Sequence, residues 1–429
     1  MSRLGQSRPV RPWWVGLVCG MASYVDAAAI ITFGIAVIIF QQTLGLDAFQ
    51  VGVASGALTL GVAVGALLGG RLGDRFGRRP VFTITMVVNI LALIVLMISP
   101  PFAVLFAAAL LLGLGTGADL PVSLSTISEA ATDENRGKLL GFSQLLWLAG
   151  AVVSSIVASS VASLGSLGIA VMFGQIAFFA LLSLLGRLSV PESESWRAAQ
   201  AEQKSGARTV RAQRAGVSEL FRSRYGVPLV ALIVFYSLTN LVANTTGQFG
   251  TYVLVNYGGV DLSIAPVLGL ALLPLSIIGS LIFMRIADKP VRYRYFLVGG
   301  VALVIGPLIY TFFGVNVVTY LLQTVFQVVG TSFAFEGIMK VWTQESFPTL
   351  LRTTAQGVIL SVARFAAAAL ASVTPLLLQV GPGLMYGILS AVSLVGVVWA
   401  GVVFRTRDRD NVFDTETALA SADERASVA

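Results

Sequence analysis

Long apolar runs, broken by charged or turn-forming residues, extend along almost the whole chain. A helix that crosses a bilayer needs about 20 mostly apolar residues. The apolar residues do not alternate with polar ones, as they would in a porin-like barrel. The pattern therefore predicts an all-α integral membrane protein with twelve transmembrane helices, at roughly 13–40, 49–70, 80–99, 102–128, 139–161, 169–187, 227–255, 263–286, 295–314, 317–344, 353–378 and 384–404.

One long polar stretch, from Pro191 to Arg224, divides these runs six and six. We therefore expect two six-helix halves joined by a polar loop. The predicted parts are an N-terminal half over residues 1–187, a cytoplasmic central loop over 188–226, a C-terminal half over 227–404 and a cytoplasmic tail over 405–429.

The basic residues are distributed unevenly along this pattern. If the N-terminus is cytoplasmic, the six connections that face outward contain no Lys or Arg. Of the 28 Lys and Arg residues, 26 lie in the termini, in the cytoplasmic connections or at their edges, and only Lys340 and Arg364 fall inside apolar runs. This is the positive-inside distribution. It predicts a multi-pass protein of the cell (plasma or inner) membrane with both termini in the cytoplasm. It also accounts for the net charge of +7 without a nucleic-acid partner.

The composition narrows the function classes. Hydrophobic residues make up 56% of the chain and charged residues 11%, against roughly 25% charged in an ordinary soluble domain. There is no histidine and one cysteine, Cys19. Histidine metal sites, Ser-His-Asp triads and intramolecular disulfides are thereby excluded. We expect no enzymatic activity, no metal and no cofactor, and the lack of a Walker motif argues against ATP as a direct energy source.

The two predicted halves carry related motifs. Arg71 and Asp74 follow the second apolar run, and Arg285 and Asp288 follow the eighth run, 214 residues later. Such a repeat implies two halves in the same orientation. Parallel repeats with a binding site between them near the membrane midplane are a transporter architecture.

Glycine also recurs with a helical period in the second run. A stripe of small residues on one helix face lets two backbones approach closely in lipid. We expect close helix packing along the stripe, which consists of Gly61, Gly65, Gly69, Gly73 and Gly77. The GxGxG at 113–117 follows no predicted strand, so it too is interpreted as a packing surface and not as a nucleotide loop.

The segment from Gly69 to Arg79, GGRLGDRFGRR, resembles the loop between helices two and three of the major facilitator superfamily. Arg and Asp beside a helix end form charge-assisted bonds to carbonyls and to a neighbouring helix. Such bonds hold one packing of the two halves and break in the other; the alternative is a basic loop that only sets orientation. The predicted gate residues are Gly70, Arg71, Gly73, Asp74, Arg75, Gly77, Arg78, Glu129, Arg136, Asp288, Glu345 and Arg352.

Further segments resemble the sugar porters and their organic-ion (synaptic-vesicle-2-like) relatives within that superfamily. They are Asp119-Leu120-Pro121-Val122 through Arg136-Gly137, Pro191-Glu192-Ser193 with Trp196, Glu345-Ser346-Phe347-Pro348 with Arg352, and Ser361-Val362-Ala363-Arg364. Two features depart from the sugar porters. Ala109 and Leu110 stand where many members carry an arginine, and Thr239, Asn240 and Asn244 occupy the region of a glutamine pair. The resemblance therefore leaves the substrate open.

Five ionisable residues lie well inside the apolar runs: Asp26, Asp119, Glu336, Lys340 and Arg364. Charges at bilayer depth are costly unless they are paired or hydrated, and they usually face a cavity. With all five ionised, the cavity would carry one net negative charge. The run Tyr24-Val25-Asp26 is similar to the segment where many sugar porters carry a proton-coupling aspartate, so Asp26 is the first candidate for that role. The alternative for each residue is a fixed ion pair between helices.

Polar and aromatic side chains at the same depth are candidates for lining a substrate cavity. A hydrogen bond between helices is the competing interpretation for each. The candidates are Tyr24, Gln144, Trp147, Tyr236, Asn240, Asn244, Gln248 and Trp342.

These observations together predict a secondary active transporter of the major facilitator type. It would move a small polar organic solute by alternating access, with proton coupling, and function as a monomer in the bilayer. A sugar, cyclitol or other polyol is the first expectation, an organic or aromatic acid the second and a drug-type exporter the third. A sensor that keeps a transporter fold is a further alternative. A channel is disfavoured because no filter-like loop interrupts the apolar runs.

Overall fold

The computed structural model describes residues 11–46, 48–98, 100–161, 164–205, 220–221, 225–260, 268, 271–408 and 412. The regular elements in these ranges are helices. Their bounds are α1 Pro12–Leu44, α2 Ala48–Phe76, α3 Arg78–Met97, α4 Phe102–Ala130, α5 Arg136–Val161, α6 Ser166–Arg187, α7 Glu194–Lys204, α9 Gly226–Asn256, α11 Leu273–Ile286, α12 Arg292–Phe313, α13 Val317–Phe333, α14 Glu336–Ser346, α15 Thr349–Val380 and α16 Pro382–Arg407.

The predicted fold class is confirmed. Within the described residues, eleven helical spans are long and apolar enough to cross a membrane, by length and composition, and α11 is a shorter apolar helix. The eighth predicted run began at residue 263, but residues 263–267 and 269–270 lie outside the described ranges. The tenth predicted run is divided into α13 and α14, which separate at Ala334 and Phe335.

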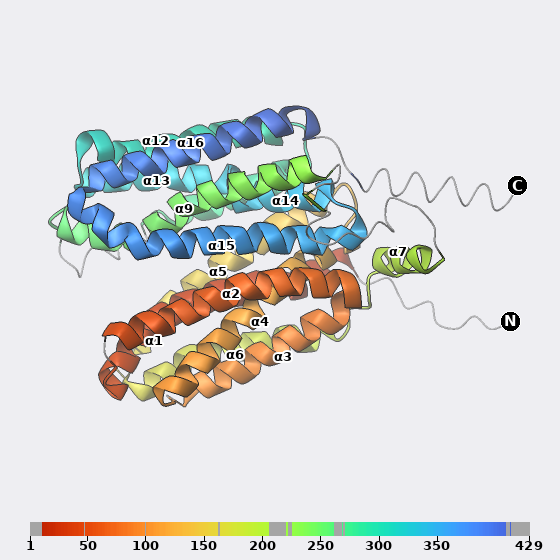
Figure 1. Ribbon diagram of the computed structural model, residues 1–429, viewed down its shortest axis with the longest axis horizontal. Helices are drawn as coiled ribbons and strands as arrows, with labels where there is room; N and C mark the ends of the chain where they lie inside the picture. The colour runs from red at the N-terminus through yellow and green to blue at the C-terminus, as the bar shows by residue number, and fades with distance from the viewer. Residues whose placement is uncertain are drawn as a thin grey trace, which may run out of the picture.

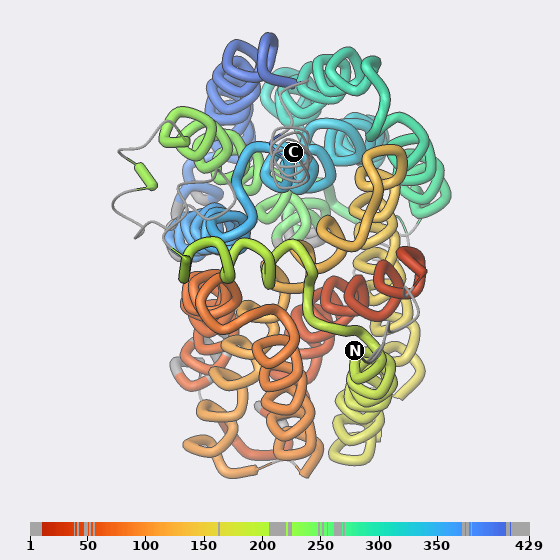
Figure 2. Tube along the Cα trace, turned by 90° about the vertical axis from the view of Figure 1, so that its right-hand side faces the viewer, coloured from red at the N-terminus to blue at the C-terminus, as the bar shows by residue number. Residues whose placement is uncertain are grey.

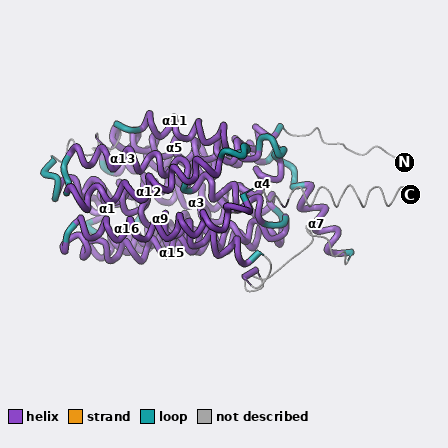
Figure 3. The backbone as a smooth tube through the Cα atoms, turned by 90° about the horizontal axis from the view of Figure 1, so that it is seen from above, coloured by secondary structure: helices purple, strands orange, loops and turns teal. Residues whose placement is uncertain are grey.

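The transmembrane helices form two bundles. Helices α1 to α6 pack against one another, and α9 to α16 form the second bundle, which lies beside the first. The long helices run along the longest axis of the molecule, and α7 is set apart at one end (Figure 3). Figure 2 shows α7 lying across that end at the boundary between the bundles. We call it the basic end, because α3, α5 and α12 begin there with Arg78, Arg136 and Arg292.

The glycine stripe of α2 lies against α4, as predicted. A Cβ atom added at Gly61, Gly65 or Gly69 would fall 2.3–2.5 Å from a carbonyl oxygen of α4. The facing glycines of the GxGxG segment on α4 lie equally close to the α2 backbone, since a Cβ at Gly117 would lie 2.1 Å from the carbonyl oxygen of Val62. A larger side chain on either face would force the two backbones apart.

The two bundles meet at the basic end through α2 with α15 and through α5 with α11. A Cβ at Gly70 would lie 2.6 Å from the carbonyl oxygen of Thr353, and one at Gly137 would lie 2.7 Å from the Cβ of Ala287. Helices α2 and α15 are closest beside α7 and diverge toward the opposite end (Figure 1). Two charged residues, Asp26 of α1 and Arg364 of α15, lie between the bundles near the middle of their helices.

Candidate functional site

An ion pair joins the two bundles near the middle of α1 and α15. The Arg364 guanidinium on α15 lies 3.2 Å from Oδ2 of Asp26 on α1. The Trp147 indole on α5 donates to the same oxygen over 3.2 Å. The Asp26 carboxylate is buried, and its other oxygen, Oδ1, has no hydrogen-bond partner among the described residues. A buried carboxylate with one unsatisfied oxygen is costly, so this group is a place for a proton or for a polar ligand.

A second ion pair lies within one helix of the second bundle. Glu336 begins α14, and Lys340, one turn later, approaches its carboxylate to 2.8 Å. An acidic residue in the first helical turn is favoured by the helix dipole. The Lys340 ammonium also reaches across to Ser143 Oγ at 3.4 Å and Gln144 Oε1 at 3.3 Å on α5. The Tyr236 hydroxyl on α9 donates to Glu336 over 3.4 Å.

The two pairs differ in what they connect. Asp26 and Arg364 belong to different bundles, whereas Glu336 and Lys340 share one helix. The first pair therefore depends on how the two bundles are placed, and the second does not. The two carboxylates balance the two cations, so the four ionised groups sum to zero and not to the expected net negative charge.

Asp119 does not join these groups. Its carboxylate binds the Arg187 guanidinium at the end of α6, with nitrogen–oxygen distances of 2.5 and 2.9 Å, and both side chains are fully buried. Thr85 and Ser123 donate to the same carboxylate, and Arg187 also bonds the Val18 carbonyl. This pair ties α1, α4 and α6 together inside the first bundle. Asp119 therefore forms an ion pair inside the first bundle, and it does not contact Arg364.

The sequence analysis did not anticipate the role of Arg187. The arginine was counted with the basic residues at the edges of the apolar runs, because it is the last residue of α6. The signal that identifies it is the cost of the buried Asp119 charge, which requires a cation nearby. The cost of the buried charge predicts that Asp119 has a cationic partner. Only the packing of α4 against α1 and α6 identifies that partner as Arg187.

The predicted cavity residues divide into two groups. Gln144, Trp147 and Tyr236 contact the central ion pairs. Asn240 lies one turn after Tyr236, is buried and has no partner for its Oδ1 within the described residues. Asn244 is partly buried, and the side chain of Gln248 lies outside the described residues.

Two other candidates point away from the centre. The Tyr24 hydroxyl donates to Gln175 on α6 over 3.1 Å, inside the first bundle. The Trp342 indole donates to Asp408 over 2.7 Å and stacks on Phe404 at 4.1 Å between ring centroids. The hydrogen bonds of Tyr24 and Trp342 thus connect separate helical segments, which agrees with the alternative interpretation of these two residues.

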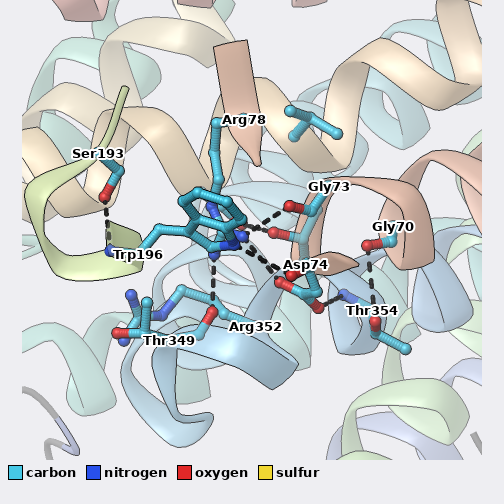
Figure 4. A network of polar contacts seen from close by, with 12 residues as sticks. Gly70, Gly73, Asp74, Arg78, Ser193, Trp196, Thr349, Arg352 and Thr354 are labelled. Atoms are coloured by element: carbon cyan, nitrogen blue, oxygen red, sulfur yellow. Dashed lines mark hydrogen bonds and ion pairs between the residues drawn. The ribbon is translucent and has the colours of Figure 1, made fainter. Parts of the chain in front are cut away.

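The predicted gate residues form a network at the basic end (Figure 4). Asp74 at the end of α2 accepts a hydrogen bond of 2.7 Å from the backbone N–H of Thr354 on α15. The Arg78 guanidinium binds Asp74 at 3.1 Å, Glu129 at 2.7 Å and the carbonyl oxygen of Thr349 at 2.7 Å. Arg352 of the second bundle also reaches Glu129, at 3.4 Å. These bonds connect the bundles through charges that are out of water, so they are stronger than exposed pairs.

The central loop takes part in the same network. The Glu192 carboxylate accepts from the first backbone N–H groups of α3, at Arg78 over 2.9 Å and at Arg79 over 3.1 Å. The Trp196 indole on α7 donates to the carbonyl oxygen of Asp74 over 3.0 Å. Gly77, between α2 and α3, has a φ of 100°, and a Cβ there would meet Glu192. A glycine is therefore required where the loop approaches the turn.

A second copy of this network lies in the other bundle. Arg292, the equivalent of Arg78, binds Glu345, the equivalent of Glu129, at 2.7 Å. Arg292 also binds Asp408, at 2.9 Å. Asp288, the equivalent of Asp74, accepts from the backbone N–H groups of Gly137 over 2.5 Å and Lys138 over 3.1 Å. Burial raises the pKa of the Asp288 carboxyl, although the two N–H groups lower it.

The remaining predicted gate residues make further contacts. Arg71 is exposed. The Arg75 guanidinium lies over the Phe76 ring, 5.2 Å from its centroid. Arg136 binds Asp133 at 2.7 Å and the carbonyl oxygen of Ser128 at 3.3 Å, and it also interacts electrostatically with Glu345 of the second bundle.

Comparisons with known proteins agree with this architecture. The family model described as Major Facilitator Superfamily matches residues 16–372. The chain is 29% identical over 393 residues to the minor myo-inositol transporter of Bacillus subtilis (strain 168), covering 90% of each. It is 27% identical to an inner membrane metabolite transport protein of Escherichia coli (strain K12), covering 88% of this chain and 87% of that protein.

A solved structure has the same fold. The proton:xylose symporter XylE, bound to 6-bromo-6-deoxy-D-glucose, superposes with a TM-score of 0.77 at 17% identity. The match covers 91% of this chain and 95% of that one. At this identity the likeness concerns the fold alone.

Proposed function

The chain belongs to the major facilitator superfamily, and from this premise we propose that it carries a sugar, cyclitol or other polyol across the membrane by alternating access, coupled to protons. It is a multi-pass membrane transporter and not an enzyme. The similarity to a myo-inositol transporter over 90% of both chains supports the polyol. The unpaired Asn240 Oδ1 and the Gln144 amide are groups that hydrogen-bond hydroxyls.

The observation that carries the coupling is the Asp26–Arg364 pair between the bundles. Protonation of Asp26 removes its charge and weakens its attraction for Arg364, so one proton changes the energy of separating the bundles at this depth. The gate at the basic end holds the bundles together while α2 and α15 diverge at the other end. The described arrangement then corresponds to an outward-facing carrier, if the basic end is cytoplasmic.

The proposal is tested with the purified protein in proteoliposomes. We expect labelled myo-inositol to accumulate when an inward proton gradient is imposed. Asp26→Asn, which resembles the permanently protonated carboxyl, should still exchange solute between two loaded compartments but should not accumulate it. Glu134→Gln, at an exposed carboxyl, is the control and should behave as the parent. Uphill accumulation by Asp26→Asn would refute Asp26 as the proton carrier.

One observation favours a second candidate, an organic acid. The Arg364 side chain keeps 15% of its surface exposed, whereas that of Asp26 keeps 2%. A guanidinium matches a carboxylate with two parallel hydrogen bonds. An anionic solute would therefore take the place of Asp26 once that group is protonated.

A thermal-shift panel of polyols, sugars and monocarboxylates separates the two candidates. Binding to the native state raises the unfolding temperature by mass action. Stabilisation by carboxylates alone, lost in Arg364→Gln, would overturn the polyol assignment. Stabilisation by polyols alone would exclude the acid.

A further inference from the structure

A pocket remains unassigned at the basic end of the second bundle, where it adjoins the second copy of the gate network at Asp408. It lies where α12 begins and α16 ends, has a volume of about 570 Å³ and includes Arg294, Arg405 and Asp408 in its lining. The Tyr293 hydroxyl donates to the carbonyl oxygen of Gly401 over 2.7 Å, which ties the two helices together beside the pocket. The pocket is therefore built on two packed helices and not on a loop.

The charge of this pocket is positive. Among the described lining residues the one carboxylate is that of Asp408, which binds the Arg292 guanidinium at 2.9 Å and accepts from the Trp342 indole over 2.7 Å. Arg294 and Arg405 are exposed. Two arginines, one on α12 and one on α16, thus line a recess whose described acid already has partners. Guanidinium groups in such a pair bind phosphate oxygens bidentately.

Each of these arginines also ends an exposed apolar stripe. Residues spaced three and four apart lie on one face of a helix. On α12 this face carries Arg294, Val298, Val301 and Ile305, the last three with 60%, 58% and 38% of their surface exposed. On α16 it carries Val395, Val398, Val402 and Arg405, the first three with 58%, 54% and 70% exposed.

Two apolar stripes that end at one basic pocket match the chemistry of a phospholipid. We propose that this pocket binds the headgroup of an anionic phospholipid, with the phosphate between Arg294 and Arg405 and the acyl chains along the faces of α12 and α16. Basic pockets between transmembrane helices are known to take anionic headgroups. The proposal is independent of the transported solute, because none of its residues touches the central ion pairs.

The test measures lipid binding by the full-length protein in a neutral detergent. Phosphatidylglycerol is titrated against phosphatidylcholine with the same acyl chains, and the bound lipid is counted by native mass spectrometry. We expect one phosphatidylglycerol to bind with a clear preference. Removing one arginine, in Arg294→Ala or Arg405→Ala, should weaken it about fivefold, and removing both about thirtyfold. Arg407→Ala, an exposed arginine outside the pocket lining, is the matched control and should leave affinity unchanged.

Two further arms distinguish the headgroup from a soluble anion and from general charge. Inorganic phosphate at the same concentration should not compete, because it lacks the acyl chains. The variant Arg294→Lys/Arg405→Lys keeps both charges but lacks the paired guanidinium donors, so it should lose part of the preference, whereas general charge attraction would leave the preference unchanged. Equal affinity for the two lipids, equal weakening by Arg407→Ala, or full competition by inorganic phosphate would each overturn the lipid assignment.

Discussion

Buried charges are the single residues that carry the sharpest predictions. Arg364 pairs with Asp26 between the bundles, and Arg187 pairs with Asp119 inside the first bundle. Glu336 and Lys340 are four residues apart on one helix, so their spacing alone can bring them together. The positions of Asp26, Asp119 and Arg364 in apolar runs mark them as buried charges, but they do not identify the partners. Pairing between helices depends on which faces meet, and a sequence does not state that.

The Asp119–Arg187 pair should be essential for folding. Arg187→Ala leaves a carboxylate buried without its cation, which typically costs about 3–5 kcal/mol. We expect a large loss of monodisperse protein and of unfolding temperature in detergent. The double variant Asp119→Leu/Arg187→Met should recover much of that loss, since it removes both charges together. A double variant as unstable as the two single losses combined would contradict a direct pair.

Arg364→Ala should be among the most damaging changes for transport. A double-mutant cycle with Asp26→Asn tests its partner. We expect a coupling of about 0.5–3 kcal/mol between positions 26 and 364, because the groups are in contact. The same cycle between positions 364 and 119 should be additive. The readout is the unfolding temperature together with solute exchange in proteoliposomes. Additivity at positions 26 and 364 would contradict the pair.

At the scale of elements, the apolar pattern predicted most of the helices well. The glycine spacing predicted the face of α2 that packs on α4, because a small residue every four positions has few other uses in lipid. The division between α13 and α14 was not predicted, because no proline lies at Ala334 and Glu336 was interpreted as a charge inside one continuous span. It places Glu336 in the first turn of a new helix at the depth of the central site.

The two gate aspartates give a prediction at this scale. In the structure both carboxylates accept backbone N–H groups across the two bundles, one for Asp74 and two for Asp288. We therefore expect Asp74→Asn and Asp288→Asn to favour opening of the basic end to a similar degree. In each variant the asparagine amide puts an NH₂ donor in place of one carboxylate oxygen. This donor cannot accept the hydrogen bond that the oxygen accepted, so a contact between the bundles is weakened.

This opening is measured by maleimide labelling of Thr353→Cys in a Cys19→Ser background. Thr353 is buried and bonds Ser125 across the two bundles over 3.0 Å, so its labelling reports their separation at the basic end. Both aspartate variants should label several times faster than the background, and Glu134→Gln should not. An unchanged rate in either variant would reduce that loop to a signal for orientation.

For the whole molecule, the internal repeat predicted which residues are equivalent, but not how the copies connect the two bundles. Arg78 with Glu129 and Arg292 with Glu345 form matching ion pairs. The first copy extends to Thr349 and Arg352 of the other bundle. The second copy instead holds Asp408 at the end of α16, and its bond to the other bundle comes from Asp288. Arg136 and Arg352 act on the glutamate of the opposite bundle in both copies, so the copies differ mainly in the added contact of Arg292 with Asp408.

Orientation in the membrane is the remaining prediction at this scale, and it follows from charge. Connections rich in Lys and Arg remain in the cytoplasm, so the basic end, with α7, should face inward. In a Cys19→Ser background, Ser205→Cys at the end of α7 should react with an impermeant maleimide only after permeabilisation. Val318→Cys, 65% exposed near the start of α13 at the opposite end, should react in intact cells. Labelling of Ser205→Cys in intact cells would reverse the orientation. The described arrangement would then be closed on the outside, and the proton gradient that drives uptake through Asp26 would have to be read in the opposite direction.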